Sequence, residues 1–257
     1  MEKTQKLIYS EIEEYARLLH LPAIKRNFIE LSKESSLKDL SYEKYLHSLL
    51  ETEHELRLEN AKQSKIRQAH FPFKKYLEDL NVAELPEDAQ RKLKVIKMLD
   101  FIKEGQNLIL WGNSGTGKTH IAIGLGIKAC LEGYKVLFTT IPLLINQLKE
   151  SRSNQVLRRL ESQFLRYDLV IADELGYISF DKEGSELLFT HLSLRAGRKS
   201  TIITTNLSFE RWNEIFQDPV MTAAMVDRLT HKAYMIDMLG DSYRLKETKE
   251  WIEKNTF

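Results

Sequence analysis

Eight consecutive residues, 112–119, have the types and spacing of a loop that binds phosphate groups. They read Gly-Asn-Ser-Gly-Thr-Gly-Lys-Thr and match the pattern G-x-x-x-x-G-K-[ST] at every fixed position. Consecutive backbone N–H groups in such a turn, which opens onto a helix N-terminus, form a concave donor site for phosphate oxygens. Lys118 would reach the β- and γ-phosphates, and the Thr119 hydroxyl would ligate Mg²⁺. The sequence therefore predicts a nucleoside triphosphate site, the alternative being a glycine-rich surface turn. Its predicted residues are Gly112, Asn113, Ser114, Gly115, Thr116, Gly117, Lys118 and Thr119.

Two adjacent carboxylates, Asp173 and Glu174, end a short apolar stretch about fifty residues beyond this loop. A strand that ends in this way resembles a Walker B element. In that arrangement Asp173 would hold Mg²⁺ through water, because Mg²⁺ keeps most of its aqua ligands. Glu174 would polarise the attacking water, which is the role that hydrolysis needs. The alternative is a pair of acids that caps the next turn.

Three further polar residues are candidates for the same site. Asn206 follows a predicted strand, and its amide could orient water near the γ-phosphate. Arg228 is the candidate for an arginine supplied to a neighbouring subunit, which would tie hydrolysis to assembly. Arg244 could contact the phosphates of the nucleotide in its own subunit. The alternatives are a turn asparagine at position 206 and surface ion pairs at Arg244. The predicted catalytic residues are thus Lys118, Glu174, Asn206 and Arg228.

Alternating strands and helices must position these residues. Apolar helical spacing after the loop, over 121–131, gives the strand–loop–helix setting that the motif requires. A further helix is predicted over 87–102. Short apolar strands with helical crossovers favour a parallel sheet covered on both faces. The five predicted strands are Asn107–Trp111, Lys135–Thr140, Asp168–Asp173, Ser200–Thr205 and Lys232–Asp237.

Residues 1–69 show helical periodicity and form a predicted N-terminal helical domain, with a second helix from Pro22 and a long third helix after Ser41. From Asn60 to Leu77 the chain has no acidic residue. Basic residues are interleaved there with His70, Phe71 and Phe73, which suits a polyanion such as DNA. The alternative is a solvated helix end followed by a linker. The cations in this segment are Lys62, Lys65, Arg67, Lys74 and Lys75.

The composition sets outer limits. A chain of 257 residues with 42% hydrophobic residues can bury one large core or two smaller ones. The net charge of +1 confines any nucleic-acid surface to a local patch. The single cysteine, Cys130, excludes an internal disulfide or a zinc cluster and favours a reducing compartment. No stretch reaches the 18 apolar residues of a membrane span, so a cytoplasmic protein without a membrane partner is expected.

Together these motifs resemble the AAA+ ATPases, within them the DnaC-like helicase-loader branch, and most specifically the IstB-type helper ATPases of insertion-sequence transposition. The resemblance covers nearly the whole chain. It departs from many AAA+ proteins in that about twenty residues follow the fifth predicted strand, too few for an extended helical lid. The residues that carry it are Gly112–Thr119, Asp173–Tyr177, Asn206, Asp227–Leu229, Gly240–Leu245 and Leu19–Pro22.

The resemblance implies an ATP- and Mg²⁺-dependent oligomer that binds double-stranded DNA, recruits its transposase and stimulates insertion. It implies an N-terminal DNA- or partner-binding domain over 1–69 and an AAA+ ATPase domain over 70–257. In this branch an extra helix follows the second strand, and stretches 141–150 and 156–166 fill that place. Their excess of cations predicts a second DNA-facing surface. Its DNA-binding candidates are Lys149, Arg152, Arg158 and Arg159, with Arg166 nearby.

Other functions remain open at the level of sequence. The nearest keeps the ATPase but makes it a loader for the replicative helicase. A second is a P-loop kinase for a small molecule, which the paired carboxylates Asp173 and Glu174 disfavour, as does the lack of an arginine-rich mobile lid. A third is a nucleotide-gated DNA scaffold that never hydrolyses ATP.

Overall fold

The computed structural model describes residues 2–255 of the chain. The chain falls into two compact units that divide between Ser64 and Lys65. The division lies within a long helix, α3 (Tyr42–Gln68), and the predicted domain boundary after residue 69 follows the end of this helix.

The first unit is helical, as its periodicity predicts. It contains α1 (Glu2–Leu18), α2 (Pro22–Leu37) and most of α3. Pro22 occupies the first turn of α2, where a missing N–H costs no hydrogen bond. The buried carboxylate of Glu53, on α3, accepts hydrogen bonds from the N–H groups of Ala23 (2.8 Å) and Ile24 (3.3 Å). It thereby satisfies the otherwise unpaired donors at the start of α2.

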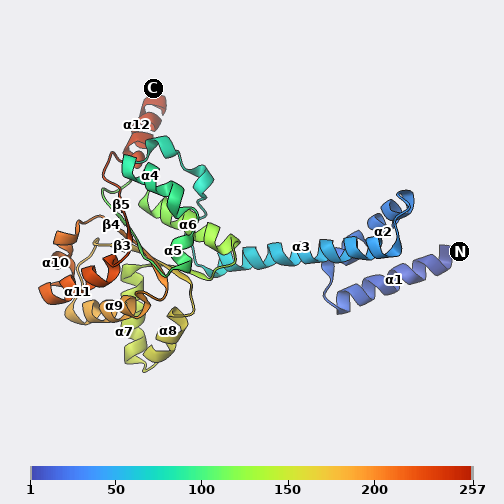
Figure 1. The fold of residues 1–257 in the computed structure, drawn as a ribbon, viewed down its shortest axis with the longest axis horizontal. Coiled ribbons are helices and arrows are strands. Elements are labelled where there is room, and N and C mark those ends of the chain that lie inside the picture. The colour runs from blue at the N-terminus through green and yellow to red at the C-terminus, as the bar shows by residue number, and fades with distance from the viewer. Residues whose placement is uncertain (1, 256–257) are drawn as a thin grey trace. The chain divides into compact units, whose positions relative to one another are not determined.

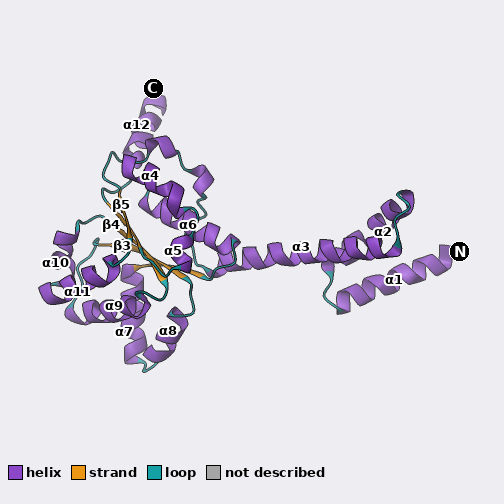
Figure 2. Cartoon of the chain, in the orientation of Figure 1, coloured by secondary structure: helices purple, strands orange, loops and turns teal. Residues whose placement is uncertain are grey.

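The second unit is built on a five-stranded sheet in the order β2-β3-β4-β1-β5, and all its strand pairs are parallel. Figure 2 shows the sheet enclosed by helices. The predicted strands are confirmed, with ends that differ by at most two residues. They are β1 (Leu108–Trp111), β2 (Val136–Thr140), β3 (Leu169–Leu175), β4 (Ser200–Thr205) and β5 (Tyr234–Asp237).

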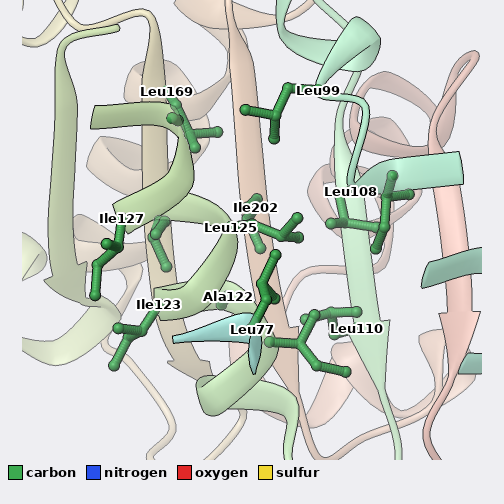
Figure 3. Close-up of a cluster of buried hydrophobic side chains, with 14 of the residues drawn as sticks. Leu77, Leu99, Leu108, Leu110, Ala122, Ile123, Leu125, Ile127, Leu169 and Ile202 are labelled. Atoms are coloured by element: carbon green, nitrogen blue, oxygen red, sulfur yellow. The ribbon is translucent and has the colours of Figure 1, made fainter. Parts of the chain in front are cut away.

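Two hydrophobic clusters cover the two faces of this sheet. Successive residues of β1 alternate between them: Leu108 and Leu110 belong to the first cluster and Ile109 to the second. The first cluster is drawn in Figure 3, where Leu77, from a short 3₁₀ turn, packs among side chains of α6 and the strands. Its helices are the end of α3, with Ile66, and α4 (Glu87–Ile96), α5 (Asp100–Lys103) and α6 (Lys118–Leu131). Cys130 is buried in the same cluster.

Helices on the opposite face form the second cluster, and Figure 1 shows them on the other side of the strands from α6. They are α7 (Ile141–Ser153), α8 (Leu157–Phe164), α9 (Lys182–Arg195), α10 (Asn213–Phe216) and α11 (Pro219–Thr230). A final helix, α12 (Tyr243–Asn255), has no buried residue. Within the described residues, no helix has the length and apolarity needed to cross a membrane.

The single helix predicted over 87–102 is wrong, because the structure divides it into α4 and α5. Leu99 lies between them with φ 59°, in the left-handed region, and is completely buried. This turn redirects the backbone so that Ile96 on one side and Phe101 on the other both enter the first cluster. No glycine or proline marks the break. A left-handed backbone is unfavourable for leucine, and the burial of Leu99 offsets this energetic cost.

Candidate nucleotide site

The phosphate loop connects β1 to α6 at the carboxyl edge of the sheet. Gly117 has φ 94°, a left-handed conformation at the N-terminus of α6 that favours glycine. At Gly112 an added Cβ would lie 2.3 Å from the backbone carbon of Met238, so glycine is required by close approach. The loop therefore directs its N–H groups toward the start of a fourteen-residue helix, where an anion is stabilised.

Lys118 is 6% exposed and lies across this loop. Its Nζ donates to the carbonyl oxygens of Gly112 (2.8 Å) and Asn113 (2.5 Å). Burial lowers the pKa of Lys118 to about 8; the nearby Asp173 carboxylate opposes this shift and Arg244 adds to it. The ammonium group is thus held by two neutral carbonyls that phosphate oxygens could replace. Arg244 is therefore within electrostatic reach of Lys118.

Thr119 and Asp173 meet at the predicted Mg²⁺ position. The Thr119 hydroxyl lies 3.1 Å from Oδ1 and 3.2 Å from Oδ2 of the Asp173 carboxylate, which is 3% exposed. Burial raises the pKa of Asp173, although hydrogen bonds from Thr204, Thr119 and the Glu174 N–H oppose this effect. These hard oxygen donors fit Mg²⁺, which uses one or two protein carboxylates and keeps several waters. Among the described residues, no group of three His, Cys, Asp or Glu could form a denser metal site.

Glu174 is turned out of the strand toward solvent. The β3–β4 register shifts between Ala172 and Leu175, and Glu174 has φ 66° at this irregularity. Its side chain is exposed between the buried Asp173 and Leu175. Bulges of this kind re-aim a side chain beside a functional site, and a left-handed glutamate stores strain there. Asp173 and Glu174 therefore face different surroundings although they are neighbours in sequence.

Thr204, on β4, connects these two acids. Its hydroxyl donates a hydrogen bond to Asp173 Oδ1. The same hydroxyl accepts a hydrogen bond of 3.0 Å from the Glu174 N–H. The sequence alone indicates no role for Thr204. Its place near the carboxyl end of a strand is the signal that could have identified it. One buried hydroxyl thus joins the candidate metal-binding carboxylate to the backbone of the candidate base.

Asn206 follows β4 at the same edge of the sheet. Its Oδ1 is buried and makes no hydrogen bond within the described part of the chain. An added Cβ at Gly176 would lie 2.7 Å from this oxygen, which places Asn206 against the turn that follows Glu174. Tyr177, in that turn, lies with its hydroxyl 3.5 Å from Ser114 Oγ of the phosphate loop. The turn, the loop and Asn206 therefore border one region.

Arg228 is not brought to the phosphate loop of its own chain. It lies in the last turn of α11, with its guanidinium 4.8 Å from the ring centroid of Phe189, on α9. Leu229 beside it belongs to the second cluster, whereas α6 covers the first. Sequence reasoning missed Phe189 because no spacing rule connects the two helices. The arginine is exposed and held over an aromatic face, a contact suited to guanidinium.

The segment before α12 contacts the phosphate loop directly, which the sequence did not reveal. The Tyr243 N–H donates to the Gly115 carbonyl (3.0 Å), and the Asn113 amide donates to the Gly240 carbonyl (3.2 Å). Lys246 in the first turn of α12 pairs with Glu84 at 2.6 Å. These contacts fix the start of α12 to the phosphate loop, which would hold the nucleotide.

The predicted DNA-binding cations differ in their surroundings. Lys149 pairs with Asp181 at 2.7 Å, and Arg152 pairs with Glu183 at 3.4 Å. Arg158 and Arg159 on α8 are exposed, and no carboxylate of the described residues forms an ion pair with either. In the N-terminal set, Lys62 and Lys65 are half-buried, and Lys65 Nζ donates to the Gly133 carbonyl. The fully exposed members of that set are Arg67, Lys74 and Lys75.

Solved structures with the same fold define the class of protein. The DnaC helicase loader aligns with a TM-score of 0.51 at 20% identity, covering 71% of this chain and 98% of that one. DnaA from Aquifex aeolicus bound to AMPPCP gives a TM-score of 0.53 at 18% identity, covering 70% and 55%. The chain therefore has the P-loop AAA+ fold, preceded by helices, and the predicted fold class is confirmed.

Within this class, residues 14–251 match the family model of IstB-like ATP binding proteins, and the chain belongs to that family. A protein of insertion sequence IS5376 from Geobacillus stearothermophilus, named as ATP-binding, is 32% identical over 95% of this chain and 97% of its own length. Its counterpart in IS21 of Pseudomonas aeruginosa is 33% identical over 96% and 94%. The predicted family and the predicted ATPase class are both confirmed by these matches.

Proposed function

We propose that this chain is an ATP-hydrolysing helper of insertion-sequence transposition, which assembles on duplex DNA and recruits a transposase. The observation that carries the proposal is the separation of Asp173 and Glu174: one carboxylate is buried against Thr119, and the other is turned outward by a strand irregularity. A site for binding alone needs the first carboxylate, whereas hydrolysis also needs the second. The insertion-sequence names of the relatives support the biological setting.

In this proposal the loop residues 112–119 bind the triphosphate of ATP through their N–H groups. Lys118 exchanges its bonds to Gly112 and Asn113 for the β- and γ-phosphates. Thr119 and Asp173 would hold Mg²⁺, which neutralises charge on the phosphate oxygens. Arg244, whose charge already influences Lys118, would contact the same phosphates.

Glu174 acts on the attacking water as general base, and the Asn206 amide orients that water. Glu174 lies near the carboxyl end of β3, and Asn206 follows the carboxyl end of the adjacent strand β4. The proton of the water passes to the Glu174 carboxylate as the water oxygen attacks the γ-phosphorus. The bond from that phosphorus to the β–γ bridging oxygen breaks, and ADP leaves with this oxygen. Because the Glu174 side chain is exposed in the single chain, a neighbouring subunit is needed to exclude bulk water from this step.

Arg228 supplies the missing positive charge to a neighbouring subunit. Its position over Phe189 leaves it outside its own site and on the surface. Mixing two inactive variants tests this role. Glu174→Gln keeps Arg228, and Arg228→Ala keeps Glu174, so mixed assemblies regain intact sites while neither variant alone turns over ATP. Failure of the mixture to regain activity would remove Arg228 from the neighbouring site.

Duplex DNA would contact two sets of cations. The first is the N-terminal set, Lys62, Lys65, Arg67, Lys74 and Lys75, and the second comprises Lys149, Arg152, Arg158 and Arg159 on α7 and α8. Such contacts release counterions from DNA, so binding should weaken steeply as salt is raised.

One experiment tests the reaction, the substrate and the partner together: ATP turnover with and without duplex DNA, followed by capture of the transposase encoded by the same element. Stimulation by DNA and capture that depends on ATP are expected, with Glu174→Gln as the inactive control. Delivery of a replicative helicase to DNA without transposase binding would instead show a helicase loader. Phosphate transfer to a metabolite, independent of DNA, would show a kinase.

A further inference from the structure

A hollow beside Arg228 is left unfilled by the described residues 2–255. Glu186, Phe189 and Thr190 of α9 line it, together with Asp218 and with Val220, Met221 and Ala224 of α11. The Phe189 ring that lines the hollow also lies beneath the Arg228 guanidinium. Val220 is 81% exposed. The hollow is therefore an apolar surface with two acids that is continuous with the candidate arginine.

Spacing along α11 places these residues on one face. Val220, Ala224 and Arg228 are four residues apart, and Met221 lies seven residues before Arg228. Seven residues of helix span about 10.5 Å. If Arg228 reaches the nucleotide of a neighbouring subunit, the hollow faces a part of that subunit about 10.5 Å from its nucleotide.

Helix α12 extends from the phosphate loop. Its start is fixed by the bonds of Gly240 and Tyr243 to the loop, and the rest of the helix buries no residue. Arg244 lies in the first turn of α12 and is close enough to Lys118 to lower its pKa. Trp251 follows seven residues later on the same face, about 10.5 Å further along, and is 66% exposed.

We propose that Trp251 of one subunit inserts into the hollow beside Arg228 of the next subunit. Helix α12, whose start is bonded to the phosphate loop of its own subunit, would then hold the neighbouring Arg228 at the nucleotide of that loop. The occupant is thus a second copy of this chain, and the inference rests on the proposed role of Arg228 in trans. The spacings on the two helices match, because seven residues separate Met221 from Arg228 on α11 and seven separate Arg244 from Trp251 on α12. Tryptophan suits the hollow because its rings bury a large apolar area. Its indole N–H can donate to Glu186 or Asp218.

Fluorescence of the full-length protein tests the contact directly. Of the three tryptophans, Trp212 is buried, Trp111 is half-buried and Trp251 is exposed. Adding a non-hydrolysable ATP analogue and duplex DNA should shift the emission of wild type to shorter wavelength, as Trp251 leaves water. The Trp251→Phe variant should show no such shift. A shift of equal size in that variant, or none in wild type under conditions where it assembles, would overturn the inference.

Cysteine cross-linking identifies the surface that Trp251 meets. Copies with Val220→Cys, mixed with copies with Trp251→Cys, should form a mixed disulfide dimer when nucleotide and DNA are present. Leu245→Cys, on another face of α12, is the matched control and should not cross-link to Val220→Cys. Native Cys130 is buried, and burial raises its pKa to about 12, so it should not react.

The mixing assay with Glu174→Gln and Arg228→Ala separates the two levels of failure. Restored turnover without the Val220–Trp251 cross-link would refute the docking of Trp251 and leave Arg228 in trans intact. Absence of both the restored turnover and the cross-link would refute the supply of Arg228 to a neighbouring subunit. Trp251→Ala should weaken assembly at least about tenfold, whereas ATP affinity of isolated subunits should be unchanged. The matched Lys249→Ala variant, at another exposed position of α12, should assemble normally.

Discussion

The Thr119 hydroxyl lies 3.1 Å from the Asp173 carboxylate, which is 54 residues further along the chain. Two motifs that are recognised separately in the sequence are therefore already joined in the folded protein. The contact holds both candidate oxygen ligands in place before any ion is bound, which reduces the ordering that binding must otherwise impose. Among residues 2–255, no cation forms an ion pair with this buried carboxylate, and its burial therefore has a cost.

The first prediction concerns this cost. Burial raises the pKa of Asp173, so the folded protein binds that proton more tightly than the unfolded chain does. Stability of the metal-free protein therefore falls as pH rises from the unfolded pKa through the folded pKa. At pH 7.5, Asp173→Asn removes the buried charge and should raise Tm by about 2–4 °C, equivalent to roughly 1 kcal/mol. The same change should cut Mg²⁺-dependent turnover by at least about 10². Thermal melts without Mg²⁺ and steady-state assays with it measure the two effects.

Asp168 provides the control with the opposite sign. Burial would raise its pKa, but hydrogen bonds from the Lys135 N–H and the Lys199 ammonium outweigh burial and lower it. Its charge thus contributes stability above its unfolded pKa, which is lost as pH falls. Asp168→Asn should lower Tm at pH 7.5 and leave the Mg²⁺ requirement unchanged. A lower Tm for Asp173→Asn as well would contradict the first prediction.

The second prediction concerns pH and Lys118. In the free protein burial lowers the pKa of Lys118 to about 8, and bound phosphates would raise it again. Above pH 8 binding must therefore add a proton, and ATP affinity should fall about tenfold between pH 7 and pH 9. Equilibrium binding of a non-hydrolysable analogue measures this dependence. Lys118→Arg stays charged throughout and should bind more weakly, with a flat profile over the same range. A flat profile in wild type would show that Lys118 does not meet the phosphates.

Some parts of this site could be predicted from the sequence because they are local. The loop 112–119, the apolar stretch before Asp173 and the polar residues that end β4 are each contained in a few consecutive residues. Parallel strands bring their carboxyl ends to one edge, so a correct strand order was not needed to predict that Asp173 and Asn206 approach the loop.

The remaining features depend on contacts between distant segments. The irregularity that exposes Glu174 arises from the register of β3 against β4, and the break at Leu99 arises from its burial in the first cluster. Phe189 supports Arg228 from another helix. None of these contacts leaves a periodic or compositional signal, which is why the sequence assigned one helix to 87–102 and no partner to Arg228.

The third prediction concerns Thr204, a positioning residue that acts through Asp173 and Glu174. Thr204→Val keeps the shape of the side chain but removes a donor to Asp173 Oδ1 and an acceptor for the Glu174 N–H. Loss of a buried partner costs about 1–3 kcal/mol, so kcat should fall about tenfold or more with little change in KM for ATP. The hydrogen bond from Thr204 lowers the Asp173 pKa, and its loss should move the acid limb of the pH–rate profile to higher pH. Thr204→Ser should restore both properties. An unshifted limb would reduce Thr204 to a packing role.

The fourth prediction separates two pairs of cations on neighbouring helices. Arg158 and Arg159 on α8 are exposed, whereas Lys149 and Arg152 on α7 already pair with Asp181 and Glu183. If both α8 arginines meet phosphates, their reversal to glutamate should reduce the slope of log affinity against log salt by about 1.8, or roughly 0.9 for each contact. Reversal of the α7 pair should change the slope less, because those cations must first leave their carboxylates. Lys94→Glu, at an exposed position of α4, is the control for a charge reversal away from the proposed DNA surface. Equal slopes for wild type and the α8 variant, measured by anisotropy from 50 to 200 mM salt, would exclude α8 from the DNA surface.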